Sequence, residues 1–134
     1  MFANIEEARK FFSGDRFAMG NGITLEELDE TRSVASLALA DGHRNAIGGV
    51  MGGAIFTLAD FAFAALVNDA SRATVAQQVS INYLNPPKGE KLVATAQYVK
   101  DGRSSCVVRI EIVDGCSRPV ATATALGFKI AKKA

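Results

Sequence analysis

Asp60 is the residue whose surroundings most suggest chemistry, because it is the only charged residue in the apolar stretch 52–68. Taking an unpaired carboxylate out of water is costly and raises its pKa, which suits a general base or a nucleophile. The alternative is a structural ion pair with an arginine from a strand or a partner chain, for which Arg72, Arg103 and Arg109 are available. We favour the functional interpretation and keep the ion pair as the alternative.

The glycine-rich segment 48–53, Gly-Gly-Val-Met-Gly-Gly, comes directly before this stretch. It has neither the spacing of a dinucleotide-binding loop nor the Gly-Lys-Ser/Thr of a phosphate-binding loop. Glycines at the start of a helix let a ligand approach backbone N–H groups, where the helix dipole favours negative charge. A developing oxyanion fits this place, with Gly52 as the donor and Gly53 beside it. A tight turn into a helix is the simpler alternative.

Asn45, His43 and the two cysteines are the remaining candidates for chemistry. The amide of Asn45 can orient a water or a carbonyl, although a turn residue is the simpler interpretation. His43 is the only histidine, and we expect a surface loop residue. Cys106 and Cys116 should lie too far apart for a disulfide, and no histidine pairs with either. No metal-ligand cluster occurs, so no metal or other cofactor is expected.

The spacing of Gly52 and Asp60 constrains any mechanism that uses both. They are eight residues apart on one expected helix, which is about 12 Å at 1.5 Å per residue. One carbonyl carbon cannot be held by the Gly52 N–H and attacked with help from Asp60 of the same chain. If both act on one substrate, they come from two chains whose helices run antiparallel about a two-fold axis.

The elements that must position these residues follow from the apolar pattern. Residues 1–12 show a short helical pattern, and residues 52–68 predict a longer helix that is apolar nearly all round and therefore buried. Strands are expected over six segments, residues 23–28, 33–39, 78–83, 92–99, 106–112 and 120–128. Small residues alternate along the last segment and predict a closely covered face; they are Ala121, Ala123, Ala125 and Gly127.

These elements predict an α+β fold in which an antiparallel sheet wraps around one long central helix. Residues 1–134 are expected to form a single domain, since the chain shows no repeat, linker or low-complexity segment.

The composition excludes several partners. A formal net charge of +1 gives no field that would recruit nucleic acid. No run of 18 apolar residues is present to cross a membrane, and the acidic N-terminus does not resemble a signal peptide. Two free thiols then indicate a cytoplasmic protein. Apolar residues make up 49% and charged residues only 22%, which suggests that part of the surface faces another protein.

The stretch Asn45 to Ala64, N-x-x-G-G-V-M-G-G-A-I-F-T-L-A-D-F-A-F-A, resembles the hot-dog-fold acyl-CoA thioesterases. Their phenylacetate-degradation branch typically has Asn, a short loop, His-Gly-Gly and a helix with Leu-Ala-Asp. The resemblance continues through V-S-I-N-Y-L-N-P at residues 79–86 and covers about 100 residues. It implies an acyl-CoA substrate, a hot-dog fold, and homodimers that often assemble into homotetramers.

The resemblance also implies roles for individual residues. Asp60 matches the catalytic carboxylate, Gly52 the glycine whose N–H polarises the thioester carbonyl, and Asn45 a polar residue that places substrate or water. Residues implied for substrate binding are Met51 and Gly53 at the glycine cluster, and Lys88, Arg103 and Ser104 in loops that often meet the CoA nucleotide.

Met51 departs from the family pattern, which usually has His at this position. A methionine can pack against the acyl group or the pantetheine arm instead. The sequence therefore favours an acyl-CoA thioesterase and leaves two alternatives. One is a non-catalytic acyl-CoA-binding protein. The other, less favoured, is a hydroxyacyl thioester dehydratase, whose chemistry needs a His with an acid.

Overall fold

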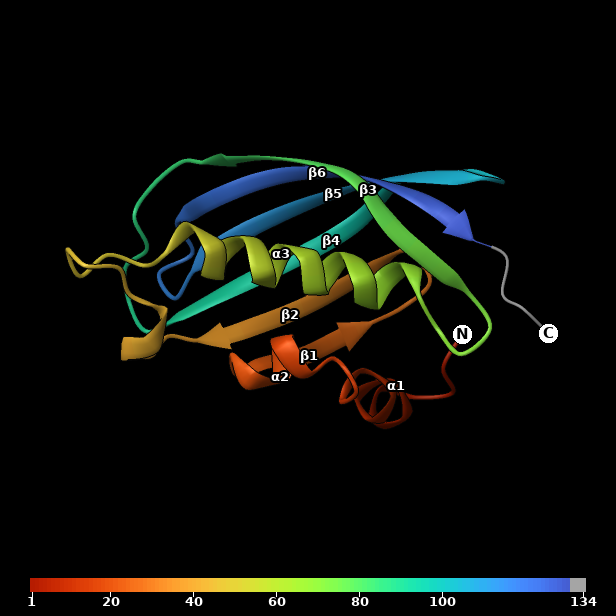
Figure 1. Ribbon diagram of the computed structural model, residues 1–134, viewed down its shortest axis with the longest axis horizontal. Helices are drawn as coiled ribbons and strands as arrows, with labels where there is room; N and C mark the ends of the chain where they lie inside the picture. Colours follow the sequence, from red (N-terminus) through yellow and green to blue (C-terminus); the bar gives the residue numbers. More distant parts are fainter. Residues whose placement is uncertain (131–134) are drawn as a thin grey trace.

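The helices begin where the sequence supplies caps. In the computed structural model, which describes residues 1–130, Asn4 caps α1 (Ile5–Phe12) and accepts a hydrogen bond from the Glu7 N–H. Asp15 caps the short α2 (Arg16–Gly20), which the sequence pattern did not predict. The long helix α3 (Gly52–Val67) matches the expected stretch to within one residue. Figure 1 shows α3 lying across one face of a curved sheet.

Six strands form one antiparallel sheet in the order β1-β2-β4-β5-β6-β3. Their bounds are β1 Ile23–Leu28, β2 Arg32–Ala38, β3 Ala73–Tyr83, β4 Lys91–Asp101, β5 Ser105–Asp114 and β6 Pro119–Ile130. The α+β fold with a sheet wrapped around one long helix is thereby confirmed, although four residues of the expected 1–134 domain lie outside the described range.

The close cover that the small residues of β6 predicted is present. Ala121, Ala123 and Ala125 are buried on the face toward α3. A Cβ on Gly127 would lie 2.7 Å from the Cys106 sulfur and 3.0 Å from the ring of Phe63. Any larger residue at this position would therefore force these side chains to shift where β6 passes α3.

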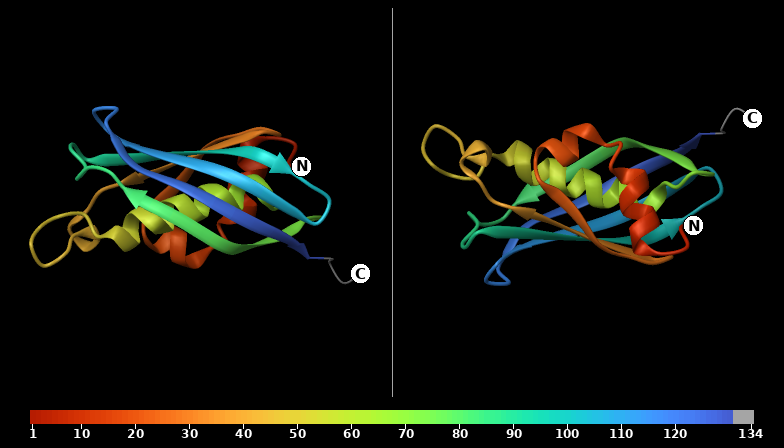
Figure 2. Two further views of the ribbon diagram at one scale, coloured as in Figure 1. Left: turned by 90° about the horizontal axis from the view of Figure 1, so that it is seen from above. Right: turned by 90° about the horizontal axis from the view of Figure 1, so that it is seen from below.

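The prediction that α3 is buried all round is wrong. Its inner side packs on the sheet through residues such as Leu58 and Ala62, and the buried Ser33 hydroxyl donates to the Ala62 carbonyl at 2.6 Å. The opposite side stays open, with Gly53 and Asp60 exposed. Figure 2 shows why: one sheet curves around α3 on one side only, and α1 and α2 flank it.

Strand β3 begins at Ala73, five residues earlier than the sequence pattern predicted. The cause is a β-bulge between Ala76 and Gln78, where the register against β6 shifts by one residue. An extra residue reverses the alternation of inward and outward side chains, so the two halves of the strand do not share one pattern. β3 is also an outer strand of the sheet, and its other edge carries no partner among the described residues.

Candidate active site

The loop before α3, residues 44–51, is shaped by Asn45. Its Oδ1 accepts hydrogen bonds from the N–H groups of Ile47 at 3.1 Å and Gly49 at 3.0 Å, and its own N–H donates to the Gly49 carbonyl at 2.8 Å. Gly48 has a φ of 86°, which the turn requires and L side chains rarely adopt. Asn45 is thus a turn residue, as its simpler interpretation held, and it also faces the cavity described below.

His43 is buried, so the expectation of a surface loop histidine is wrong. Its Nδ1 accepts from the Ala40 N–H at 3.0 Å, and its Nε2 lies 2.9 Å from the Asn21 carbonyl oxygen. These partners require the tautomer with hydrogen on Nε2. The His43 carbonyl accepts from the Met51 N–H at 2.8 Å. Both ring nitrogens are committed to the backbone, so His43 holds the loop and cannot replace the family histidine.

The backbone donors at the start of α3 are unpaired. Met51 precedes the helix with φ −62° and ψ 132°, and its side chain makes no capping hydrogen bond. Within residues 1–130, the N–H groups of Gly52 and Gly53 have no intramolecular acceptor. The first N–H groups of any helix lack partners inside the helix and lie at the positive end of its dipole. They can therefore bind an oxyanion.

A cavity of about 380 Å³ opens beside these donors, and its lining is mostly apolar. Asn45 and Gly52 both line it, together with Ile55, Tyr83 and Pro86. The Tyr83 hydroxyl donates a hydrogen bond to the Gly52 carbonyl at 3.1 Å. The structure thus brings together two of the three residues expected to act in catalysis.

The third, Asp60, lies about 12 Å further along α3 and does not line this cavity. It is exposed in the single chain, which corrects the expectation that it is buried. No arginine pairs with it among the described residues; Arg72 binds Asp69, and Arg109 lies near Glu111. Partial desolvation by its apolar neighbours raises the pKa of Asp60.

The Asp15 carboxylate, at the cap of α2, raises the pKa of Asp60 further. Within residues 1–130 of one chain Asp60 thus has no ion-pair partner, and its raised pKa suits a base or nucleophile.

Met51 and Gly53 lie exposed at the same end of α3. The Met51 side chain is 54% exposed and does not pack in the hydrophobic core. It is therefore available to contact a ligand that enters beside Gly52.

Lys88 is held near this end of the molecule by a buried carboxylate. Asp114 accepts from the Lys88 N–H at 2.8 Å and from the N–H groups of Cys116 and Arg118. These bonds, led by that from Lys88, hold the pKa of Asp114 below its usual range despite its burial. The loop around Pro87, which borders the cavity, is therefore fixed, and the Lys88 side chain projects into solvent.

Arg103 and Ser104 lie at the opposite end of the sheet. They form the turn between β4 and β5, while Lys88 comes just before the start of β4. The 11 residues of β4 span about 33 Å, and Figure 1 shows the two turns at opposite ends. One chain does not bring Lys88 and Arg103 to one ligand.

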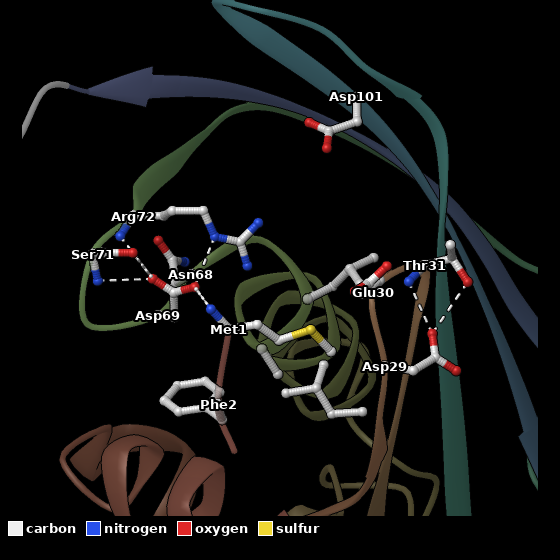
Figure 3. Close-up of a pocket in the computed structure, with 13 residues that line it drawn as sticks. Met1, Phe2, Asp29, Glu30, Thr31, Asn68, Asp69, Ser71, Arg72 and Asp101 are labelled. Atoms are coloured by element: carbon white, nitrogen blue, oxygen red, sulfur yellow. Dashed lines mark hydrogen bonds and ion pairs between the residues drawn. The ribbon is translucent and has the colours of Figure 1, made fainter. Parts of the chain in front are cut away.

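A second cavity, of about 430 Å³, lies near the C-terminal end of α3 (Figure 3). Its polar centre is Asp69, a buried carboxylate bound by the Met1 α-amino group at 3.0 Å and the Arg72 Nε at 2.9 Å. Burial alone would raise the pKa of Asp69, but its bonds to Ser71, Met1 and Arg72 hold it well below its usual range. This network fixes the turn between α3 and β3.

Residues 47–121, which include Met51, Gly52, Asp60 and Lys88, match the thioesterase superfamily. The chain belongs to the thioesterase superfamily. The expectation of a thioester hydrolase is confirmed at this level.

Among curated relatives of this thioesterase, acyl-coenzyme A thioesterase PaaI of Escherichia coli is 33% identical over 117 residues, covering 87% of this chain and 84% of the relative. Human acyl-coenzyme A thioesterase 13 is 28% identical, over 69% and 68% of the two chains. The structure of E. coli PaaI, from the phenylacetic acid degradation operon, superimposes with a TM-score of 0.89 at 30% identity, covering 96% and 94%. The expected branch and hot-dog fold are thereby confirmed.

A thioesterase protein of Streptococcus pneumoniae TIGR4, solved with coenzyme A, matches with a TM-score of 0.82 at 26% identity, covering 92% of this chain and 99% of the other. No group of His, Cys, Asp and Glu within residues 1–130 of this thioesterase could hold a metal ion. None of its described helices is long and apolar enough to cross a membrane.

Two residues near the candidate site, Asp15 and Tyr83, were not expected from the sequence. Asp15 is distant in sequence, and only the packing of α2 against α3 brings it near Asp60. Tyr83 lies in the expected strand 78–83, where Val79, Ile81 and Tyr83 alternate with the polar residues Gln78, Ser80 and Asn82. That pattern places Tyr83 on the α3 side of the sheet, but its contact with Gly52 follows only from the three-dimensional fold.

Proposed function

We propose that this protein hydrolyses acyl-CoA thioesters to the free acid and CoA. The observation that carries the proposal is one helix that bears unpaired N–H donors at its start and an unpaired carboxylate of raised pKa two turns later. The Gly52 N–H would stabilise the oxyanion that develops on the thioester carbonyl. Asp60 would activate a water or attack the carbonyl carbon itself. The C–S bond breaks, and CoA leaves as the thiol.

The 12 Å between the two groups implies that each site takes Gly52 from one chain and Asp60 from a second copy. The sheet supports a homodimer, because β3 is a long outer strand with neither a charged residue nor a proline between Ala73 and Tyr83. Natural proteins usually protect free edges with charges, prolines, bulges or covering segments. Strand β3 has one bulge, between Ala76 and Gln78, but no charge or proline, so most of its edge can pair with another strand. Pairing of two β3 strands would also cover the open side of α3 near Asp60.

The same arrangement would bring the separated binding loops together. With the helices antiparallel, the Lys88 end of one chain lies toward the Arg103 end of its partner. Lys88 from one chain, and Arg103 and Ser104 from the other, would then meet the CoA phosphates, while Met51 and Gly53 would contact the thioester end. Asn45 would orient substrate or water from the cavity wall.

Two further expectations belong to this proposal. Assembly of dimers into a homotetramer is supported by the resemblance to the family. A cytoplasmic location is supported by the two unpaired thiols, Cys106 and Cys116. Sedimentation velocity measures the first, and fractionation of cells that express the tagged protein measures the second.

A thiol reagent that detects free CoA tests the activity across aryl-CoA and short- and medium-chain acyl-CoA esters. We expect turnover by the wild type and a loss of at least 100-fold in kcat for Asp60→Asn. Asp41→Asn, which removes the same charge from an exposed turn, serves as the control. Unchanged turnover in Asp60→Asn contradicts the assignment of Asp60. Tight binding of CoA esters without turnover supports the non-catalytic alternative, and an enoyl product from a 3-hydroxyacyl-CoA supports the dehydratase.

A further inference from the structure

We infer that Tyr83 is a positioning residue that holds the Gly52–Gly53 segment in the geometry needed to bind the thioester oxygen. The inference rests on the proposed function and deepens it, because it names the residue that fixes the proposed oxyanion donors of this chain.

The segment that carries the two N–H donors has little conformational restraint of its own. Gly52 and Gly53 are consecutive glycines in the first turn of α3, and Met51 supplies no capping hydrogen bond. Glycine loses more backbone freedom on ordering than any other residue, so a Gly-Gly pair at a helix end frays easily. A donor that must be in place before the charge develops needs a restraint from outside the helix.

Tyr83 supplies such a restraint in two ways. Its hydroxyl donates to the Gly52 carbonyl at 3.1 Å, which fixes the plane of the peptide that carries the Gly53 N–H. Its ring covers the Gly52 Cα, since a Cβ added there would lie 3.3 Å from the ring carbon Cζ and 3.4 Å from the hydroxyl. Gly52 therefore cannot move toward β3 without displacing the ring.

The position of Tyr83 favours a role in the site over a role in the core. The residue is 52% exposed and lines the same cavity as Asn45 and Gly52. A tyrosine that served only packing would bury its ring and gain more from the hydrophobic effect. Here the ring forms one wall of the cavity, and its hydroxyl contacts the backbone of the donor segment.

The second tyrosine of the chain provides a matched control. Tyr98 on β4 also reaches a backbone carbonyl of α3, that of Leu66, with its oxygen at 3.5 Å, but at the far end of the helix. Tyr98→Phe and Tyr83→Phe thus remove the same hydroxyl from the same kind of partner. If the Tyr83 hydroxyl contributed only to the stability of the fold, the two variants would have the same kcat.

The test combines kinetics with backbone amide measurements on the full chain. For Tyr83→Phe we expect kcat to fall about fivefold with KM changed less than twofold, and Tyr98→Phe to retain wild-type kcat. In ¹⁵N-labelled protein, the Gly52 and Gly53 amides should exchange faster and show lower order parameters in Tyr83→Phe only.

The amide measurement decides the role of Tyr83 even if the wild type hydrolyses no CoA ester, in which case the proposed function fails separately. Unchanged Gly52 and Gly53 amides in Tyr83→Phe overturn the inference, as do equal changes in Tyr98→Phe. Altered amides with unchanged kcat in an active enzyme also overturn it, because the restraint would then have no part in binding the oxyanion.

Discussion

Among single residues, Asp60 should control the pH dependence of hydrolysis, because partial desolvation and the Asp15 charge raise its pKa. A base or nucleophile must be ionised, so kcat/KM should fall on the acid side with an apparent pKa above the value of about 3.9 for an ordinary aspartate. Removing Asp15 should move this limb to lower pH. Asp15→Asn keeps an oxygen that can cap α2, and the pH profile of hydrolysis measures the shift.

Asp41→Asn is the control for that profile, since Asp41 has no part in raising the pKa of Asp60. An acid limb that moves equally in both variants, or upward in Asp15→Asn, contradicts the electrostatic account.

The raised pKa of Asp60 also makes the stability of the fold depend on pH. The folded chain binds the Asp60 proton more tightly than the unfolded chain does, so the contribution of this proton to stability is complete below the unfolded pKa and is lost as the pH rises through the folded pKa. At pH 7 the ionised carboxylate is therefore less favourable in the folded chain than a neutral side chain would be. Asp60→Asn should therefore keep or increase Tm at pH 7 while hydrolysis is lost. Thermal unfolding at pH 7 measures this. A clear decrease in Tm would show that the ionised carboxylate contributes to the fold.

Gly52 offers a test of one backbone hydrogen. It is the first residue of α3, where proline is well tolerated, and Met51 already has the extended conformation that a following proline requires. Gly52→Pro thus removes the N–H and retains the helix. We expect a loss of about 10²–10³ in kcat. Gly52→Ala adds a similar Cβ against Tyr83 but keeps the N–H, and it should lose much less. Equal losses in the two variants contradict the role of the N–H.

At the scale of elements, the contact of β6 with α3 sets a stability test. A Cβ on Gly127 would lie 2.7 Å from the Cys106 sulfur and 2.8 Å from Thr74 Cγ2. Gly127→Ala should destabilise the fold by about 1–3 kcal/mol through overpacking. Gly20→Ala, with nothing within 4 Å of its added Cβ, is the control. Denaturant unfolding gives both values, and an unchanged midpoint for Gly127→Ala would show that the sheet adapts.

The elements also show what a sequence can and cannot predict. Apolar periodicity located α3 and most strands, because burial against one core imposes one period on each. It failed at β3, where the bulge near Gln77 reverses the alternation. It also overstated the burial of α3, because apolar residues on its open side are consistent with a second copy as well as with a core.

The candidate site was predictable to the same degree. The spacing of Gly52 and Asp60 indicated donors and a carboxylate 12 Å apart, and the structure places both on one helix. Asp15 and Tyr83 could not be found this way, since each reaches the site through the packing of a different element. His43 was misjudged for the same reason: its two ring partners, Ala40 and Asn21, are defined only in the folded loop.

For the whole molecule, the central claim is that one active site needs two chains. The open side of α3, the uncharged outer strand β3 and the separation of Lys88 from Arg103 all support a two-fold dimer with antiparallel helices. Each dimer would contain two sites, and each site would combine Gly52 of one chain with Asp60 of the other.

Mixing two inactive variants tests this claim most directly. Asp60→Asn and Gly52→Pro, unfolded together and refolded in equal amounts, should form mixed dimers in which one site has both mutations and the other has none. Release of CoA from an acyl-CoA ester should then recover to about one quarter of the wild-type rate, since half the dimers are mixed and each has one intact site. A mixture that forms mixed dimers and stays as inactive as either variant alone would place the whole site within one chain.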